Sequence, residues 1–354
     1  MILENVPTIV EIKKAIPKRC FEKSMNLSFY YVLRDISYAF SSYMILLGLE
    51  GCIENSYVLI KAGVYIGYWI LQGTIFAGIF CLGHDCGHGS FSNNGILNDT
   101  VGNILHTFIL APYYPWKLSH RVHHKNTNNI DKDEVFYPIR ENQDNPRKKD
   151  SLLKNLPFFA FGFGWFGYVV KGYGPNGRNI SHLNPINKHF KGHYTECFIS
   201  LILMILWTVG PLRQYYIVFG IRSLLCHYLM PVFGFGCWIV LITFLHHHDD
   251  GVPWFSNEEW SYVKGQLCSI DRHYGWAHDI LHSIGTHQIH HLFPQIPHYH
   301  LEEATRVFRQ KYPNLIRCNA NPIVSSYFKG CIRFNRQEII KNNTAVHVFK
   351  DKKD

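Results

Sequence analysis

Four long apolar runs limit what this chain can fold into. Each run approaches the ~20 residues that a helix needs to cross a bilayer, and they cover residues 36–53, 58–82, 197–212 and 224–245. The mean hydropathy of −0.07 is low for a membrane protein, which is expected if about half of the chain is a polar cap outside the bilayer. Four buried helices of a soluble protein are the alternative. We predict an all-α integral membrane protein with four transmembrane helices.

Charges beside these runs predict how the chain crosses the membrane. The loop EGCIENSY, between the first two runs, has two glutamates and no lysine or arginine. The positive-inside rule then places the N-terminus and the long middle segment in the cytosol, and an even number of spans returns the C-terminus to that side. Arg213 and Arg222, in the second outer loop, depart from the rule. The basic residues on the cytosolic side include Lys13, Lys14, Lys18, Arg19, Arg34, Arg121, Lys125, Arg147, Lys148, Lys149, Arg178 and Lys191.

We expect a single membrane domain with a helical cytosolic cap. Its segments are an N-terminal segment (1–34), two helical hairpins (36–82 and 197–245) and two parts of the cap (83–195 and 246–354). Two broken apolar stretches, 96–116 and 156–170, are expected to be interfacial helices with Trp116 and Trp165 at headgroup depth. The aromatic side chains of the second stretch are expected to face lipid, with an acyl channel as the alternative.

Composition excludes several other classes of protein. The ten cysteines form no CxxC pair, and no apolar core of signal-peptide length lies near the N-terminus, so we expect reduced thiols. The net charge of +9 suits nucleic acid, an anionic membrane surface or an acidic protein partner. No signature of a nucleic-acid-binding fold is present, so we expect no nucleic acid.

Histidines recur in three clusters just outside the predicted spans, all on the predicted cytosolic side. The pattern HxxHH places its three imidazoles on one face of a helix. With 22 histidines in 354 residues, this pattern arises by chance roughly 0.08 times per chain, yet it occurs twice. The clusters HDCGH, HRVHH and HQIHH contain His84, His88, His120, His123, His124, His287, His290 and His291.

Eight neutral imidazoles at one place indicate metal binding, and eight donors are too many for one ion. Zinc hydrolases usually have three protein ligands, and the HExxH motif with its general base is absent. The Glu-x-x-His pairs of carboxylate-bridged di-iron bundles are absent from these clusters too. We therefore predict two non-haem irons that activate O₂ against an apolar substrate in the bilayer. No catalytic side chain beyond the ligands is expected.

Other polar residues are weaker candidates. His247, at the end of the fourth run, is a candidate ninth ligand, although His246 and His248 adjoin it. Acidic residues near the clusters are either partners that orient the ligands or solvated charges; they are Asp85, Asp131, Asp133, Glu134, Asp249, Asp250, Asp271 and Asp279. Four histidines are expected to be hydrogen-bonded structural residues, or residues that contact the ligands, rather than ligands themselves: His106, His282, His298 and His300.

Three longer stretches carry a resemblance to a known family. GHDCGHGSFS, WKLSHRVHHKNTNNIDKDEVFYP and GTHQIHHLFPQIPHYHLEEAT resemble the three histidine boxes of the integral-membrane fatty acid desaturases. The similarity is greatest to the methyl-end group, the omega-3 and delta-12 acyl desaturases. It extends through LNDTVGNILHTFILAPY, LHHHDDGVPWFSNEEWSYVKG and IDRHYG, and covers most of the chain.

This resemblance implies a di-iron enzyme of the endoplasmic reticulum membrane that uses O₂ to insert a cis double bond into an unsaturated acyl chain. The box histidines would be the iron ligands, and His247 looks like a further histidine of the family's fourth-helix segment. The first box departs from the delta-12 form, which usually has a histidine where this chain has Gly89. We therefore favour omega-3 over delta-12 activity.

The sequence also predicts the electron donor and the cellular compartment. The fused cytochrome b5 domain of some relatives, with its HPGG motif, is absent, so electrons would come from a separate cytochrome b5 and its reductase. The lack of a transit peptide argues against a ferredoxin-fed plastid enzyme. The tail KDKKD, with Lys350 and Lys352, resembles a dilysine retrieval signal or is merely a solvated tail.

Several alternatives remain open at this point. The same scaffold could act as an acyl hydroxylase, acetylenase or conjugase, because the first hydrogen abstraction is shared. A membrane protein that binds metal without catalysis is the rival from another class. The sequence also leaves open whether the acyl carrier is a phospholipid or coenzyme A, and the oligomeric state.

Overall fold

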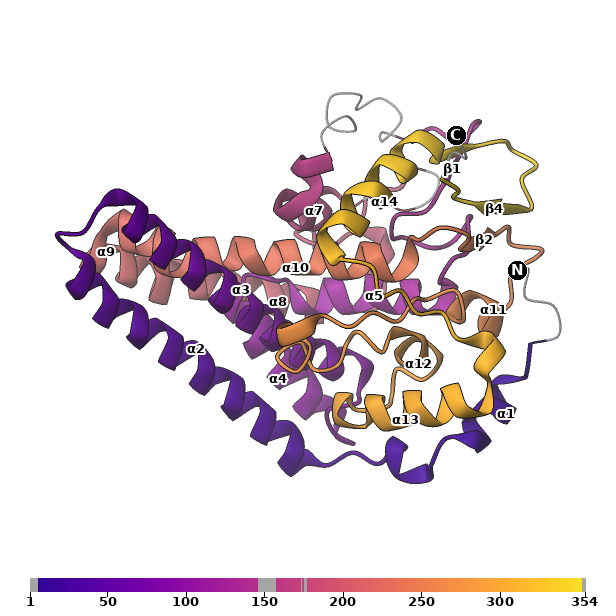
Figure 1. Cartoon of the computed structure of the whole chain (residues 1–354), viewed down its shortest axis with the longest axis horizontal. Helices are drawn as coiled ribbons and strands as arrows, with labels where there is room; N and C mark the ends of the chain where they lie inside the picture. Colours follow the sequence, from indigo (N-terminus) through magenta and orange to yellow (C-terminus); the bar gives the residue numbers. More distant parts are fainter. Residues whose placement is uncertain (1–5, 146–156, 173, 175–176, 352–354) are drawn as a thin grey trace.

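Helices make up most of the molecule. The structure, a computed structural model, describes residues 6–145, 157–172, 174 and 177–351. Figure 1 shows an arm of long helices extending from a wider body, and both marked chain ends lie on the body. The mostly helical prediction is therefore confirmed. Outside the described residues lie several that the predictions use: Arg147, Lys148, Lys149, Leu156 and Lys352.

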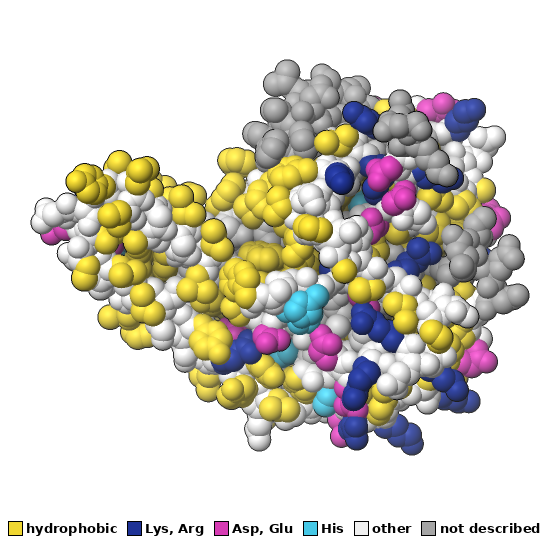
Figure 2. Space-filling view, viewed as in Figure 1, with side chains coloured by type: hydrophobic (Ala, Val, Ile, Leu, Met, Phe, Trp, Pro, Cys, Tyr) yellow, Lys and Arg dark blue, Asp and Glu magenta, His cyan; other side chains and the backbone are white. Residues whose placement is uncertain are grey.

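The arm is built from long apolar helices. Helices α2 (Met25–Ile53) and α3 (Val58–His88) pack against each other, and a third helical segment covers Tyr194–His247. All three are long and apolar enough to cross a membrane. The 29 residues of α2 extend about 44 Å, which exceeds the ~30 Å hydrocarbon core of a bilayer. Hydrophobic side chains cover much of the arm in Figure 2, as expected of a surface that contacts lipid.

The third segment folds back on itself. Its helical path is broken at Gly220, where φ is 80°, a conformation that glycine adopts readily. Trp207 Nε1 donates a hydrogen bond to Tyr228 Oη (3.0 Å) across the fold. The four predicted runs thus fall on α2, α3 and the two halves of this segment, while four membrane crossings remain a prediction. The segment comprises α8 (Tyr194–Trp207), the π-helices η5 (Thr208–Leu212) and η6 (Leu224–Leu229), α9 (Arg213–Ser223) and α10 (Met230–His247).

Helices α3 and α10 carry histidines at their ends into the body, where shorter helices surround them. Helices α7 (Pro157–Lys171) and α14 (Ile323–Gln337) pack on α10, and α4 (Gly95–Phe108) packs on α3 and α8. Among the described residues, the body also contains α1 (Ile9–Ala15), η1 (Lys18–Phe21), α5 (Tyr113–Asn126), η4 (Lys188–Phe190), α11 (Tyr262–Gln266), η7 (Gly275–Ala277), α12 (His287–Leu292), α13 (His298–Lys311) and η8 (Pro313–Leu315).

Two short sheets fasten the C-terminal segment to the body. Strand β1 (Ile139–Arg140) pairs in parallel with β3 (Ile339–Ile340). Strand β2 (Pro253–Phe255) pairs antiparallel with β4 (Val346–Val348), so that Trp254 lies opposite His347. The sequence did not predict these sheets, because two- and three-residue strands carry no periodicity that can be recognised.

Trp116 and Trp165 lie in the interior. Their exposed fractions are 4% and 3%, and both rings meet Phe80 edge to face, at centroid distances of 4.8 and 5.6 Å. These two side chains therefore pack against protein and do not face lipid, and their headgroup depth remains a prediction. The physical reason is that α5 and α7 turn these side chains towards α3, where aromatic edges and faces attract one another.

Candidate metal centre

The first group of histidines joins three helices. Residues four apart on α3, and again on α5, face the same direction, so their Nε2 atoms approach to 3.2 Å on α3 and 3.0 Å on α5. Helix α12 contributes the fifth imidazole. One ligand atom from each member lies within 4.8 Å of the others, and the members are His84, His88, His120, His124 and His290.

The second group contains His123, His247 and His291, whose ligand atoms also lie within 4.8 Å of one another. His123 Nε2 is 3.1 Å from His247 Nε2. His287 adjoins this group, because its Nε2 lies 3.0 Å from His291 Nε2. The rings of His124 and His291 stack at 4.0 Å and so connect the two groups. All nine histidines predicted from the sequence therefore meet at one place.

The helical phase of α10 distinguishes its three consecutive histidines. Only His247 belongs to a histidine group among the described residues. His246 bonds through Nδ1 to the Ile270 carbonyl and through Nε2 to Tyr274 Oη. His248 bonds through Nε2 to the Phe136 carbonyl at 2.9 Å. Of these three histidines, His247 is therefore the candidate ligand.

Buried acceptors fix the direction of three imidazoles. Asp133 Oδ1 accepts a hydrogen bond from His123 Nδ1 at 2.8 Å, and the Ile284 carbonyl accepts one from His287 Nδ1 at 3.2 Å. Gln266 Oε1 accepts a hydrogen bond from His291 Nδ1 at 3.0 Å, because the amide nitrogen of Gln266 donates to the His124 carbonyl. A proton on each Nδ1 leaves the Nε2 lone pair free for a metal.

The arrangement of nitrogens fits bound cations. His287 and His291 both carry their proton on Nδ1, so two lone pairs face each other across 3.0 Å, and a cation between them removes the repulsion. His290 Nε2 is buried and has no hydrogen-bond partner among the described residues. Metal–imidazole bonds of about 2.1 Å place two ligands at right angles about 3.0 Å apart. All-imidazole donors suit iron, copper, zinc and nickel.

Burial keeps five imidazoles of α5 and α12 neutral. It lowers the pKa of each well below the usual value, and neighbouring imidazoles lower the pKa further, because a charged ring would be repelled. Neutral rings can bind a metal at physiological pH without first losing a proton. The histidines with this lowered pKa are His120, His124, His287, His290 and His291.

The acidic residues have diverse roles. Asp133 orients His123 directly, whereas Asp131 pairs with Arg140 at 2.7 Å. Asp85 binds His298 at 2.9 Å and lies 3.8 Å from His84 Nδ1. The others contact groups outside the two histidine groups: Asp249 pairs with Arg272, and Asp271 with Arg309 and the backbone N–H of Gln288. Asp250 accepts from the backbone N–H of Asp351, the Asp279 backbone carbonyl accepts from the Arg34 side chain, and Glu134 lies 3.4 Å from His189 Nε2.

Three further histidines are hydrogen-bonded and lie outside both histidine groups, as predicted. His106 Nε2 bonds to the Phe80 carbonyl at 3.2 Å, and His282 bonds to Asp35 at 2.7 Å. His298 bonds to Asp85. The fourth, His300, lies half-buried against the ring of Tyr299.

Thr127 and Gln266 both contact the candidate ligand His291, and the sequence analysis did not identify either. Thr127 Oγ1 lies 3.0 Å from His291 Nδ1, the same atom that donates a hydrogen bond to Gln266 Oε1. Thr127 follows His123 by four residues, and this helical spacing was a usable signal. Gln266 lies in α11, and no motif in its neighbourhood indicates a role.

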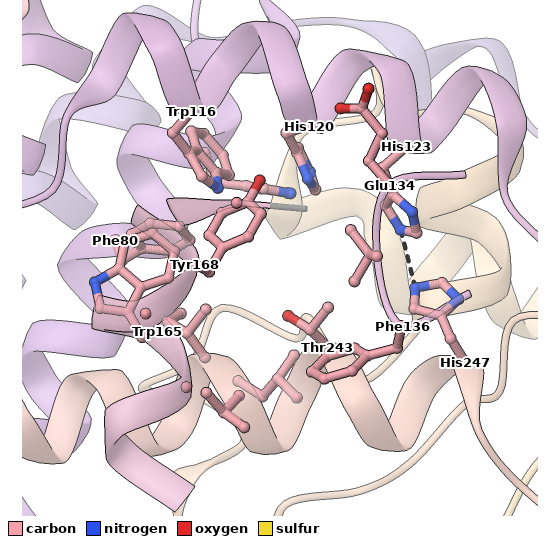
Figure 3. A pocket seen from close by; sticks show the side chains of 18 of the residues that line it. Phe80, Trp116, His120, His123, Glu134, Phe136, Trp165, Tyr168, Thr243 and His247 are labelled. Atoms are coloured by element: carbon pink, nitrogen blue, oxygen red, sulfur yellow. Dashed lines mark hydrogen bonds between the residues drawn. The ribbon is translucent and has the colours of Figure 1, made fainter. Parts of the chain in front are cut away.

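A cavity of about 460 Å³ adjoins both histidine groups, within the range of small-molecule sites. Figure 3 shows Phe80 and Trp165 on the side opposite His123 and His247. Trp165 and Tyr168 line the cavity, which corrects the expectation that the aromatic side chains of α7 mainly face lipid; Phe163 remains 53% exposed. The lining also includes exposed Lys171, at the C-terminal end of α7.

Comparisons with known proteins agree with this geometry. The family described as "Fatty acid desaturase" matches residues 63–320. The omega-3 fatty acid desaturase of the endoplasmic reticulum from Nicotiana tabacum is 37% identical over 97% of this chain and 90% of its own length. The corresponding Vigna radiata protein is 40% identical over 84% and 76%, and the sn-1 acyl-lipid omega-3 desaturase (ferredoxin) of a Nostoc strain is 37% identical over 92% and 87%. The chain therefore belongs to the fatty acid desaturase family of oxidoreductases.

Proposed function

We propose that this protein is an omega-3 acyl desaturase with two non-haem irons and O₂ as co-substrate. The observation that carries the proposal is the pair of histidine groups beside one largely apolar cavity. The proposed ligands of the two irons are His84, His88, His120, His123, His124, His247, His287, His290 and His291. Irons bound there would supply O₂ reduction and hydrogen abstraction from an unactivated C–H bond, which side chains cannot perform.

The cavity walls suit an acyl chain. Phe80, Ile239 and Val240 provide an apolar wall, and histidines from α3, α5, α10 and α12 provide the wall beside it. An extended hydrocarbon can lie along the first wall with a methylene pair facing the second. The buried aromatic rings exclude water, which protects reactive species from side reactions. Asp133, Gln266 and the Ile284 carbonyl hold the imidazoles in fixed directions.

Omega-3 rather than delta-12 activity is supported by two observations. The relatives in tobacco, mung bean and Nostoc are named omega-3 desaturases. Gly89, where delta-12 sequences usually have histidine, ends helix α3 with φ of 71°, a conformation that is strained for residues with a Cβ. A histidine would be strained here, so this backbone conformation favours the glycine that this chain has in its first histidine box.

We further propose a multi-pass protein of the endoplasmic reticulum membrane with both termini and the metal centre in the cytosol. The hairpins 36–82 and 197–245 would cross the bilayer beneath the cap. Cytochrome b5 and its reductase are the proposed electron donors. The names of the relatives indicate more than one donor and compartment, since one is named an endoplasmic reticulum enzyme and another a ferredoxin enzyme.

Expression in a eukaryotic host without polyunsaturated lipids tests the proposal. Cells receive 18:1 or 18:2 separately, and mass spectrometry locates any new double bond. We expect a new omega-3 bond from 18:2 and little change of 18:1. A product from 18:1 alone would indicate delta-12 activity, and a hydroxy acid would indicate a hydroxylase. A His123→Ala control, expressed to the same level, should form no product. Absence of any new lipid in cells that supply cytochrome b5 would contradict the proposal.

A further inference from the structure

A buried contact joins the first membrane helix to the loop before the third histidine box. Asp35 Oδ2, on α2, accepts a hydrogen bond from His282 Nε2 at 2.7 Å, and both side chains are almost fully buried. Arg34 Nε donates to the other Asp35 oxygen at 2.9 Å, and its Nη2 reaches the Asp279 carbonyl at 3.4 Å. Two adjacent residues of α2 therefore hold the loop formed by residues 278–286.

This loop has an unfavourable backbone. His282 and Ser283 both have φ of 54°, which is uncommon for residues other than glycine. The loop also rests directly on α3, because a Cβ at Gly78 would lie 2.4 Å from the Ile280 carbonyl oxygen. Strained residues persist where surrounding contacts over-determine them. The bond from His282 to Asp35 is such a contact.

One series of contacts leads from the loop to His287. Ile284 lies two residues after His282, lines the cavity and bonds through its carbonyl to His287 Nδ1. The position of this carbonyl determines where His287 Nε2 points, and that atom lies 3.0 Å from His291 Nε2. A displaced loop would therefore turn His287 away from the second histidine group.

A second series of contacts leads from His282 to His84. The rings of His282 and His298 meet at a centroid distance of 4.4 Å, and Tyr31 packs edge-on against both. His298 Nδ1 donates to Asp85 Oδ2 at 2.9 Å. The other oxygen of Asp85 lies 3.8 Å from His84 Nδ1. The order of contacts is thus Asp35, His282, His298, Asp85 and His84.

We propose that Asp35 is a positioning residue for the metal centre. Through His282 it fixes the loop that orients His287, and through His298 and Asp85 it steadies the imidazole of His84. The inference rests on the proposed function, because it assumes that these two histidines are ligands. It adds a carboxylate on a membrane helix that lies outside all three histidine boxes.

The test measures Fe²⁺ affinity of the purified full-length protein by competition with a chelator. Asp35→Asn preserves size but leaves one acceptor for two donors, so affinity should fall about tenfold, the lower end of the range for residues that orient ligands. His282→Leu should lose a similar amount. His282→Gln retains an amide donor for Asp35 and should bind iron almost as wild type does. The double variant Asp35→Asn/His282→Leu should bind no more weakly than His282→Leu, because both changes break one contact.

Spectroscopy and a control separate positioning from general stability. The ligand-field spectrum of the Co²⁺-substituted protein should shift in Asp35→Asn and match wild type in Ser42→Ala, a buried serine about two turns further along α2. Equal Fe²⁺ affinity in wild type, Asp35→Asn and His282→Leu would overturn the inference. If Asp35→Asn does not fold, equal affinity in His282→Gln and His282→Leu overturns it. A wild-type protein without iron, or His287→Ala with undiminished iron, would instead refute the ligand assignment of the proposed function.

Discussion

His123 and His247 approach each other to 3.1 Å through their Nε2 atoms, although one lies in α5 and the other ends α10. The second histidine group therefore forms only when α10 docks beside α5. We predict that His247→Ala retains about one iron per chain and loses desaturation by more than about 100-fold, since removing a ligand should cost at least as much as removing its partner. Iron analysis of the purified variant and product analysis in the expression host measure both effects.

The neighbouring histidine supplies the control for this variant. His248→Gln can still donate to the Phe136 carbonyl that His248 Nε2 contacts, so it should keep its iron and activity. Two irons and normal product in His247→Ala would show that α10 contributes no ligand.

Asp133 and Asp131 form a matched pair for testing how His123 is oriented. Asp133 Oδ1 bonds to His123 Nδ1, whereas Asp131 pairs with Arg140. Asp133→Asn should lower iron affinity by about 10- to 100-fold, because such partners fix the tautomer of a ligand. Asp131→Asn should leave iron affinity unchanged. Equal affinities in the two variants, measured by chelator competition, would contradict the role of Asp133.

Acid should destabilise the iron-free protein. Burial lowers the pKa of the five histidines of α5 and α12 named above, including His120 and His290. Below about pH 6.5 the unfolded chain therefore binds protons that the folded chain does not, and stability falls as pH falls. Each such imidazole costs about 1.4 kcal/mol per pH unit. Thermal unfolding of the iron-free protein in detergent should show a falling melting temperature between pH 7 and pH 5.5.

Glu134 provides a control because its effect on stability has the opposite dependence on pH. Burial raises its pKa to about 8, so the folded chain holds a proton that the unfolded chain lacks, and this contribution to stability is lost as pH rises towards 8. This loss begins near the unfolded pKa of about 4.3 and continues to about pH 8, so Glu134→Gln should flatten the alkaline side of the profile and steepen the fall on the acid side. A melting temperature that does not change between pH 5.5 and pH 7 would contradict the neutral, buried state of the imidazoles.

Phe80 should influence where the double bond forms. It lies one helical turn before His84 on α3, about 6 Å along the axis, and its ring borders the apolar end of the cavity. Phe80→Leu should deepen this end, let the methyl tail pass further and relax discrimination between positions by about tenfold. The new bonds should lie further from the methyl end, as measured by mass spectrometry. Phe163→Leu, on the exposed face of α7, should not alter the product, and an unchanged product from Phe80→Leu would refute this role.

Local patterns predicted the long helices and the nine histidines. The apolar runs correspond to α2, α3 and the segment that turns at Gly220, because hydrophobic periodicity and length are local properties. The histidine boxes were recognisable because ligands four residues apart lie on one helical face. Eight of the nine divide into groups of five and three, with His287 beside the second group, and this division was not predictable, since it depends on how α3, α5, α10 and α12 pack.

Long-range contacts account for what the sequence did not reveal. Gln266 meets His291 from a separate helix, and Asp35 meets His282 from 247 positions away. Tryptophan is a residue type typical of membrane interfaces, yet the rings of Trp116 and Trp165 pack against Phe80 in the interior of the protein. In each case the partner, rather than the local pattern, determines the role of the residue.

The iron content of the purified wild-type protein tests the central claim most directly. Elemental analysis of a preparation shown to desaturate acyl chains should give two irons per chain, one for each histidine group, and no stoichiometric zinc or copper. An active preparation with one iron per chain, or with zinc in place of iron, would contradict the two-iron account.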